Sequence, residues 1–322
     1  MAPQPIMTVA GFVENVFVPE HVVAKTLSGR THYQAILKHV LTPEEVNRVF
    51  QVDGESSRTK LKAVPDWPYL GNVPLRDIRP DHVQQLISAA LGRGYSTQTA
   101  QHIRNVVSVM FEYARRRRLV AGDNPASHVT LPDMARKESH VLTLAQAKEV
   151  LAAMHYPEKE MTLIAILTSM NVAEICGLQW KRVNLTEAWS TAEGETLPPG
   201  SIAVRKQWYR CQLGSVKKGR SRILQIPEPL LPVLLELSRR SNHTGPDDFV
   251  FVSRAGTPVN ENNIAGRRLK AIGQDLQMPW LSWHVFLRTH TALAYELGRH
   301  LMNAEVMRTS KRPAAVAVGF WI

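Results

Sequence analysis

The chain has 322 residues, with 39 lysines and arginines against 28 acidic residues and a formal net charge of +11. Hydrophobic residues make up 44% of it, which allows a substantial core and excludes a largely disordered chain. The longest apolar stretch, Met161–Met170, is too short to span a bilayer, and the N-terminus lacks the basic-then-apolar layout of a secretory signal. Two cysteines, Cys176 and Cys211, can form neither a disulfide framework nor a tetrahedral zinc site. We therefore expect a soluble, cytoplasmic protein without a metal or a membrane partner.

The first part of the chain has a helical pattern. Apolar residues at helical spacing predict helices over Tyr33–Leu41 and Asp81–Leu91, with a polar connection at Arg48–Pro68 between them. Ser96 is placed to cap a third helix, which runs to about Arg118 and carries an apolar stripe on one face.

Four consecutive arginines end this third helix: Arg115, Arg116, Arg117 and Arg118. Cations are favourable at a helix C-terminus, so helix stability and solubility explain the four arginines without a ligand. The alternative is that at least one of them contacts DNA. Since consecutive helical residues spread around the axis, not all four can face one duplex.

A domain boundary is predicted at Leu131–His140, where Pro132 and a mixed-charge stretch separate two helical patterns. We expect an all-α domain over residues 1–135 and an α+β domain over residues 136–322. Thr143–Gln146 has the form of a capping box that opens a helix through Met154. The remaining predicted elements are a buried helix at Thr162–Ser169, strands at Ser201–Tyr209, Ser221–Ile226 and Asp248–Ser253, and helices at Glu228–Arg240, Glu261–Leu276 and Thr289–Gly298.

The basic excess is concentrated in one segment of the second domain. Arg205–Arg222 contains seven basic residues and no acidic one. Such a cluster attracts polyanions, because neutralised phosphates release their condensed counterions. A solvated surface run explains the same charges, so charge alone only suggests nucleic acid.

One stretch of the second domain, Thr168–Trp180, matches a specific pattern, T-G-[LM]-R-x-x-E-[IL]-x-x-L-x-W. The matching residues are Thr168, Met170, Glu174, Ile175, Leu178 and Trp180. This stretch resembles the first catalytic box of the tyrosine recombinases (phage integrase family). Further segments resemble the family's landmarks in the same order: Tyr95–Ala126, Lys217–Arg222, Leu281–His284, Thr289–Ala294 and Glu296–Gly298. The resemblance extends over about Thr8 to Arg308.

The resemblance implies a helical core-binding (SAM-like) domain and an α+β tyrosine recombinase catalytic domain that together clamp duplex DNA. In this family a tyrosine attacks the scissile phosphodiester and two arginines hold its charge through bidentate hydrogen bonds. A lysine on a hairpin donates a proton to the leaving oxygen, and histidines assist. The chemistry requires no metal and no other cofactor.

The residues at the implied catalytic positions depart from the family pattern. Lys217 and His284 occupy the lysine and first histidine positions, whereas Asn171 and Leu287 stand where the two clamp arginines are expected. Arg288 follows Leu287, but one helical residue turns a side chain by about 100°, so we expect that Arg288 cannot substitute for it.

The end of the sequence departs in the same way. Ser310 stands at the second histidine position, and the last tyrosine of the 322 residues is Tyr295. We therefore expect a C-terminally truncated catalytic domain. The role of Glu174 is left open between the site and a structural support of the turn, and His290 is expected to pack or hydrogen-bond within its own helix.

We expect a DNA-binding protein of DNA integration and recombination, from a prokaryotic or phage mobile element, that does not cleave DNA. Its partners would be duplex DNA and either further copies of itself or an active relative. The residues expected to contact DNA are Arg115, Arg116, Arg117, Arg118, Arg205, Lys206, Lys218, Arg220, Arg222 and Arg288. Three alternatives stay open: an active recombinase with Ser310 or Tyr295 as nucleophile, a non-catalytic regulator of a recombination site, and a gene product without function.

Overall fold

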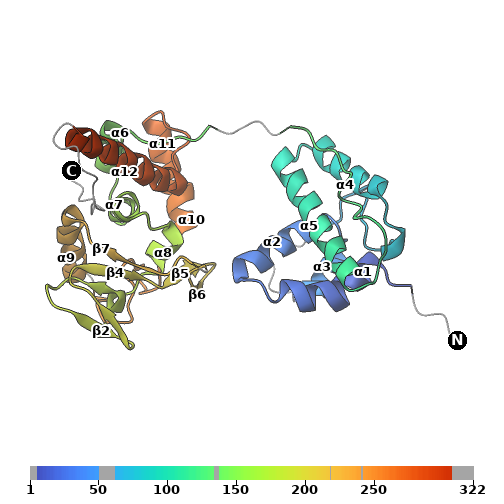
Figure 1. Cartoon of the computed structure of the whole chain (residues 1–322), viewed down its shortest axis with the longest axis horizontal. Helices are drawn as coiled ribbons and strands as arrows, with labels where there is room; N and C mark the ends of the chain where they lie inside the picture. The colour runs from blue at the N-terminus through green and yellow to red at the C-terminus, as the bar shows by residue number, and fades with distance from the viewer. Residues whose placement is uncertain (1–5, 51–61, 134–137, 218, 241, 307–322) are drawn as a thin grey trace. The chain divides into compact units, whose positions relative to one another are not determined.

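The structure is a computed structural model that describes the side chains of residues 6–50, 62–133, 138–217, 219–240 and 242–295, and the backbone of 296–306. It divides into two compact units, Met1–Lys137 and Glu138–Ile322 (Figure 1). The division falls inside the predicted boundary segment, Leu131–His140. The first unit is helical and the second is α+β, so the fold class predicted from the sequence is confirmed.

The first unit is a set of helices around one hydrophobic core. Its longest helix presents the predicted stripe to that core, since Ile103, Met110 and Phe111 are all buried. As predicted, Ser96 caps this helix, because its hydroxyl accepts a hydrogen bond of 3.2 Å from the Thr99 amide. The elements of this unit are α1 (Val9–Phe12), the π-helical η1 (Val13–Val22), α2 (Leu27–Leu37), α3 (Pro43–Phe50), the 3₁₀ turn η2 (Leu75–Asp77), α4 (Pro80–Gly92) and α5 (Thr97–Arg116).

Two predictions for the first unit need correction. The helix predicted at Tyr33–Leu41 begins earlier, at Leu27, and ends at Leu37, although Val40 and Leu41 are buried in the turn that follows. The connection predicted at Arg48–Pro68 overlaps the end of α3, and part of it lies outside the described residues.

The second unit has helices packed against a small antiparallel sheet of order β1-β4-β7 and two hairpins, β2–β3 and β5–β6. Its helices are α6 (Leu144–Ala152), α7 (Glu158–Thr168), α8 (Val172–Cys176), α9 (Leu231–Arg240), α10 (Glu261–Asn263), α11 (Lys270–Asp275) and α12 (Trp283–Val306), with 3₁₀ turns η3 (Trp180–Arg182) and η4 (Glu228–Leu230) and the π-helical η5 (Ile264–Leu269). Its strands are β1 (Val183–Asn184), β2 (Ser190–Ala192), β3 (Glu195–Leu197), β4 (Ser201–Val204), β5 (Lys206–Tyr209), β6 (Gln212–Ser215) and β7 (Arg222–Gln225).

The arrangement of this unit brings three separate segments together. Figure 1 shows α7 and α8 between α12 (red) and the strands (yellow), and α7 packs on α12 while α8 packs on β5. Gly177, at the end of α8, permits the second contact, since a Cβ there would lie 2.7 Å from the backbone of Gln207 and Trp208.

The strand predicted at Ser201–Tyr209 is divided at Arg205 into β4 and β5. On the returning arm, Val204 pairs with Arg222 and Lys206 with Ser215, so the residues between Ser215 and Arg222 leave the ladder as a loop. The Val216 amide, which donates to the Arg205 carbonyl at 3.1 Å, closes the base of this loop. Lys217 and Arg220 are therefore loop residues rather than strand residues.

Two other predictions differ in extent or kind. The strand predicted at Asp248–Ser253 is wrong: the segment forms only isolated bridges, Gln179 with Phe249 and Val252 with Pro258. The helix predicted at Thr289–Gly298 starts already at Trp283, so its first turns contain His284 and Leu287. In the described part of the chain, no helix is long and apolar enough to cross a membrane.

Candidate functional site

Three of the segments that resemble recombinase boxes, Thr168–Trp180, Lys217–Arg222 and Thr289–Ala294, contribute residues to one pocket of about 410 Å³ in the second unit. The α7–α8 connection, the loop before β7, β7 itself and α12 all contribute to its wall. The lining residues are Ser169, Asn171, Glu174, Gly219, Arg220, Arg222, Leu287, Arg288 and Thr291. The pocket therefore contains both positions at which the sequence lacks the implied clamp arginines.

Asn171 acts as the N-cap of α8. Its side-chain oxygen accepts a hydrogen bond of 3.0 Å from the backbone amide of Glu174, and its backbone amide donates to Glu174 Oε2 at 3.1 Å. The two residues thus form a reciprocal capping box, which satisfies backbone donors at the start of the helix. The side-chain oxygen of Asn171 is therefore hydrogen-bonded to the backbone of the first turn of α8.

Glu174 also holds Arg222 of β7. Arg222 Nη2 donates to Glu174 Oε2 at 2.9 Å, and Nη1 donates to Oε1 at 3.3 Å. The Glu174 side chain is only 1% exposed, while that of Arg222 is 29% exposed at the pocket wall. Both oxygens of this carboxylate therefore have donors, so Glu174 is a structural support of the turn and also orients one arginine of the pocket.

The loop before β7 contributes Gly219 and Arg220 to the pocket. The Arg220 amide donates to the Lys217 carbonyl at 2.9 Å in a turn that places Gly219 at φ 80°, a conformation that favours glycine. Lys217 itself is exposed and is not among the residues that line the pocket. Lys218 lies outside the described residues.

Helix α12 forms the opposite wall. Leu287 and Arg288 both line the pocket. That Arg288 cannot take the place of an arginine at position 287 stays a prediction. The pocket is wide enough to expose adjacent residues of the helix. Arg288 Nε is buried without a hydrogen-bond partner among the described residues, and Nη1 lies 3.5 Å from Ser139 Oγ.

Two histidines of α12 lie away from the pocket wall. His284 is exposed and does not line the pocket. His290 Nδ1 lies 2.7 Å from the Ile166 carbonyl of α7, so the hydrogen bond expected within its own helix instead crosses to a neighbouring one. Ser310 lies outside the described residues.

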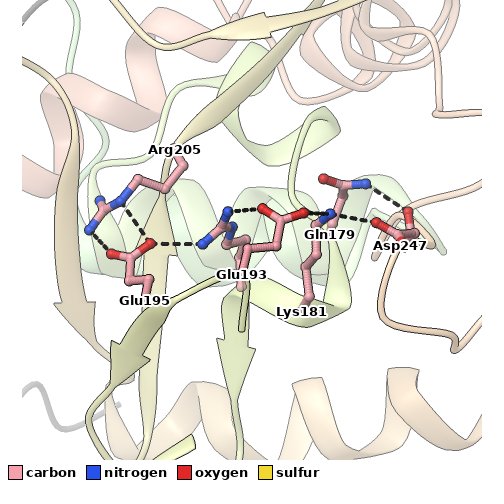
Figure 2. A network of polar contacts seen from close by, with 7 residues as sticks. Gln179, Lys181, Glu193, Glu195, Arg205 and Asp247 are labelled. Carbon is pink, nitrogen blue, oxygen red and sulfur yellow. Dashed lines mark hydrogen bonds and ion pairs between the residues drawn. The ribbon is translucent and has the colours of Figure 1, made fainter. Parts of the chain in front are cut away.

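Arg205 belongs to an ionic network beside the sheet (Figure 2). Its Nε donates to Glu195 Oε2 at 3.2 Å, and Nη2 bonds the other carboxylate oxygen. Arg182 bridges Glu195 and Glu193, and Lys181 joins Glu193 to Asp247. The hydrogen bonds that Lys181 donates to Asp247 and Glu193 raise the pKa of Lys181, and the bond that Glu193 accepts from Lys181 lowers the pKa of Glu193. The charge of Arg205 is thus engaged within the protein, whereas Lys206 stands on β5 opposite Ser215.

The four arginines at the end of α5 also differ from one another. Arg115 pairs with Glu112 at 3.1 Å, and Arg117 pairs with Glu20 at 3.0 Å. Arg116 lies over the Tyr113 ring, 5.8 Å from its centroid, and Arg118 follows the helix at φ 57°. All four side chains are exposed. No group of three metal-ligating residues occurs among the described residues of either unit.

Sequence reasoning missed the pairing of Glu174 with Arg222 and the exposure of Arg288 to the pocket. An acidic residue such as Glu174 is rarely buried without a cationic partner, so its burial indicates that one exists. Sequence spacing alone cannot identify Arg222 as that partner among the basic residues of its segment.

The sequence matches two family models. The phage integrase family matches residues 140–306, more than half of the chain, and the phage integrase central domain matches residues 60–129. The chain therefore belongs to the phage integrase family, whose members have the tyrosine recombinase fold. No curated protein gave a significant match.

Solved structures share this fold at low identity. The Tn1549 transposon integrase in complex with a circular intermediate DNA has 14% identity and a TM-score of 0.67, over 90% of this chain and 87% of that chain. A lambda integrase dimer bound to a COC′ core site has 12% identity and a TM-score of 0.57, over 97% and 100%. A lambda integrase tetramer bound to a Holliday junction has 14% identity and a TM-score of 0.52, over 89% and 72%.

Proposed function

We propose that this protein binds duplex DNA and does not cleave it. The observation that carries the proposal is the identity of two residues in the pocket: Asn171 is a helix cap, and Leu287 is an apolar wall. The family resemblance implies an arginine at each position. Losing one preorganised donor to the transition state costs about 2.7–4 kcal/mol, so losing two charged clamps removes most of the catalytic advantage.

Charge supports the DNA-binding half of the proposal. The chain carries a net charge of +11, and three arginines line the pocket. Phosphate contacts supply affinity and position, and they need neither a nucleophile nor a proton donor. The Tn1549 and lambda integrases named above were solved as DNA complexes, which makes duplex DNA the first ligand to test.

The first experiment measures binding of the full chain to a pool of randomised duplexes by fluorescence anisotropy. The affinity should fall linearly on logarithmic axes between about 50 and about 200 mM salt, because each neutralised phosphate releases counterions. Absence of binding at the lowest salt concentration would rule the proposal out. Duplexes enriched from the pool would also supply a site on which competition with an active relative, as expected of a non-catalytic regulator, can be measured.

The second experiment tests cleavage. Enriched duplexes, nicked near the centre so that a cleaved strand cannot religate, are incubated with the protein and separated on a denaturing gel. No covalent adduct should form, whereas an active integrase on its own site gives one. An adduct would establish the rival function, and the mass of the DNA-linked peptide after proteolysis would distinguish Tyr295 from Ser310. Tyr295 is 67% exposed on α12 and does not line the pocket.

A further inference from the structure

The β2–β3 hairpin carries two carboxylates at its tip. It pairs Ala192 with Glu195 around a two-residue turn, Glu193–Gly194, in which both residues have a positive φ, 50° and 75°. Positive φ at both central residues is the geometry of a type I′ turn, which suits a tight hairpin. Among the described strands, β2 and β3 pair only with each other and stay outside the three-stranded sheet. The side chains therefore decide how the tip lies beside the sheet.

The two carboxylates hold three cations that lie outside the hairpin (Figure 2). Glu195 accepts hydrogen bonds from both Nε and Nη2 of Arg205, and its Oε2 also accepts one of 2.7 Å from Arg182 Nη1. Glu193 accepts hydrogen bonds from Arg182 and Lys181. The side chains of Arg205 and Glu195 remain 23% and 26% exposed, so a ligand can reach this end of the network.

Arg205 lies at the base of the loop in the basic segment. Its carbonyl accepts a hydrogen bond of 3.1 Å from the Val216 amide, and its Nη1 donates to the Arg222 carbonyl at 2.7 Å. The loop that these bonds close carries Lys217 and Arg220. Neither of those two cations forms an ion pair in the part of the chain that the structure describes. Arg205 is thus a neutralised cation next to cations that are not neutralised.

We propose that the two carboxylates of the hairpin compete with the DNA backbone for the three cations, and so limit how many phosphates the protein contacts. The proposal rests on the proposed function, since it names residues that regulate the same DNA binding. A carboxylate and a phosphate each offer a guanidinium two oxygens in the same paired geometry, so they exclude one another. Glu193 and Glu195 thereby lower the part of the affinity that does not depend on base sequence, which increases with each phosphate neutralised.

The network withholds its cations under the conditions in which DNA binding is measured. The Arg182 side chain is only 10% exposed, and salt screens partly buried charge pairs much less than exposed ones. The root of the hairpin is held separately, because the buried Asn184 donates from Nδ2 to the carbonyls of Ala188 and Pro198 at 2.8 and 2.9 Å. Removing one charge at the tip therefore leaves the hairpin attached.

The test replaces one carboxylate at a time by its amide in the full chain. Glu195→Gln takes the charged partner from Arg205, and Glu193→Gln is the milder change, because the Glu193 side chain is 53% exposed. The matched control is Glu187→Gln, which changes the net charge equally at an exposed position just before β2 and has no cationic partner among the described side chains. Circular dichroism and thermal unfolding first establish that each variant is folded.

Binding to the randomised duplexes is followed by fluorescence anisotropy between about 50 and about 200 mM salt. Glu195→Gln should steepen the logarithmic salt slope by about 0.9, the value for one more phosphate, and should bind about three- to tenfold more tightly at the lowest salt. Glu193→Gln should change both quantities in the same direction, and Glu187→Gln should keep the slope of the wild type. Adding Arg205→Gln to Glu195→Gln should remove most of the gain, because Arg205 makes the new contact.

Elution from immobilised heparin, a sulfated polyanion without bases, gives a second readout. Glu195→Gln should elute at higher salt than the wild type and Glu187→Gln. A wild-type slope and elution in the folded Glu195→Gln and Glu193→Gln variants would overturn the inference and leave the proposed function standing. So would a gain that Glu187→Gln shares or that survives Arg205→Gln in full. A wild type that fails to bind DNA at low salt would instead remove the proposed function, while the order of elution from heparin still decides whether the hairpin withholds cations from a polyanion.

Discussion

The carboxylate of Glu174 and the guanidinium of Arg222 join the first turn of α8 to strand β7 through hydrogen bonds of 2.9 and 3.3 Å. The two residues are 48 positions apart in the chain. One side of the pair caps a helix and is almost fully buried, and the other faces the pocket. A substitution of either residue should therefore change both the stability of the second unit and the charge that lines the pocket.

Arg222→Met should lower the free energy of unfolding by about 2–4 kcal/mol, because it leaves the Glu174 carboxylate buried without its partner. Urea unfolding of the second unit, followed by hydrogen exchange, measures the change. Adding Glu174→Gln should recover most of the loss, since glutamine keeps the capping box and removes the charge. The exposed pair Arg240–Glu236 gives the control, and Arg240→Met should change stability by less than about 1 kcal/mol. Equal losses in Arg222→Met and Arg240→Met would contradict this prediction.

Gly177→Ala should destabilise the second unit by about 1–3 kcal/mol, because the new methyl group would lie 2.7 Å from the backbone of β5. The hairpin must then move away from α8. The matched control is Gly214→Ala: Gly214 stands opposite Gln207 in the same hairpin and has nothing within 4 Å of an added Cβ. Thermal unfolding compares the two variants. If Gly214→Ala is as destabilised as Gly177→Ala, the loss comes from replacing a glycine in this region and not from the close contact with β5.

Arg205 and Lys206 should respond differently to substitution although they are neighbours in the basic segment. Arg205→Gln should cost about 1–3 kcal/mol of stability, because it leaves part of the Glu195 carboxylate without a donor, and should leave the salt slope of DNA binding unchanged. Lys206→Gln should change stability by less than about 0.5 kcal/mol and lower the slope by about 0.9 if it contacts one phosphate. A reduced slope in Arg205→Gln would show that Glu195 releases its partner to DNA.

The first unit should lose stability on acidification. Burial, and secondarily the charge of Lys38, lowers the pKa of His39 from 6.5 to about 4. The unfolded chain then binds the proton at a higher pH than the folded chain does. Stability is therefore greatest above pH 6.5, falls as the pH decreases towards about 4, and changes little below that. The loss is at most about 3 kcal/mol.

The indole resonance of Trp67 measures this transition, since Trp67 is the only tryptophan among the first 137 residues and packs beside His39, with 5.9 Å between ring centroids. His39→Gln should flatten the pH dependence, whatever its effect on the absolute stability. His128→Gln, at an exposed position, should leave the pH dependence as it is in the wild type. An unchanged slope in His39→Gln would assign the acid sensitivity to other groups.

Patterns among neighbouring residues predict several helices and strands, but they do not show which distant segments pair with one another. Ser96 and Thr143 were identified as caps from their own neighbourhoods, and both cap their helices. The alternating apolar residues of Asp248–Ser253 favour a strand, but the segment forms only isolated bridges. One is to the turn after α8, where the Val250 amide donates to the Leu178 carbonyl, and the other joins Val252 to Pro258. A ladder needs a partner strand, and periodicity does not identify one.

The site is predictable to a similar extent. The motif resemblance selected the segments around Asn171 and Leu287, and these segments meet at one pocket. It could not assign Arg205 to Glu195, because that pairing depends on how β3 lies beside the sheet. Nor could the motif show that Arg288 lines the same pocket as Leu287. Adjacent helical side chains point about 100° apart, which keeps one of them out of a pocket only where the pocket is narrow.

The cap at Asn171 has a consequence for the history of such a chain. Asparagine is among the best N-cap residues, and replacing a good cap costs about 1 kcal/mol. An arginine at position 171 would give up the bond to the Glu174 amide and would compete with Arg222 for the same carboxylate. Once strand cleavage is no longer selected, a change from arginine to asparagine improves folding, and the reverse change impairs it. Loss of catalysis at this position would then be self-reinforcing, with the stability of the fold opposing its recovery.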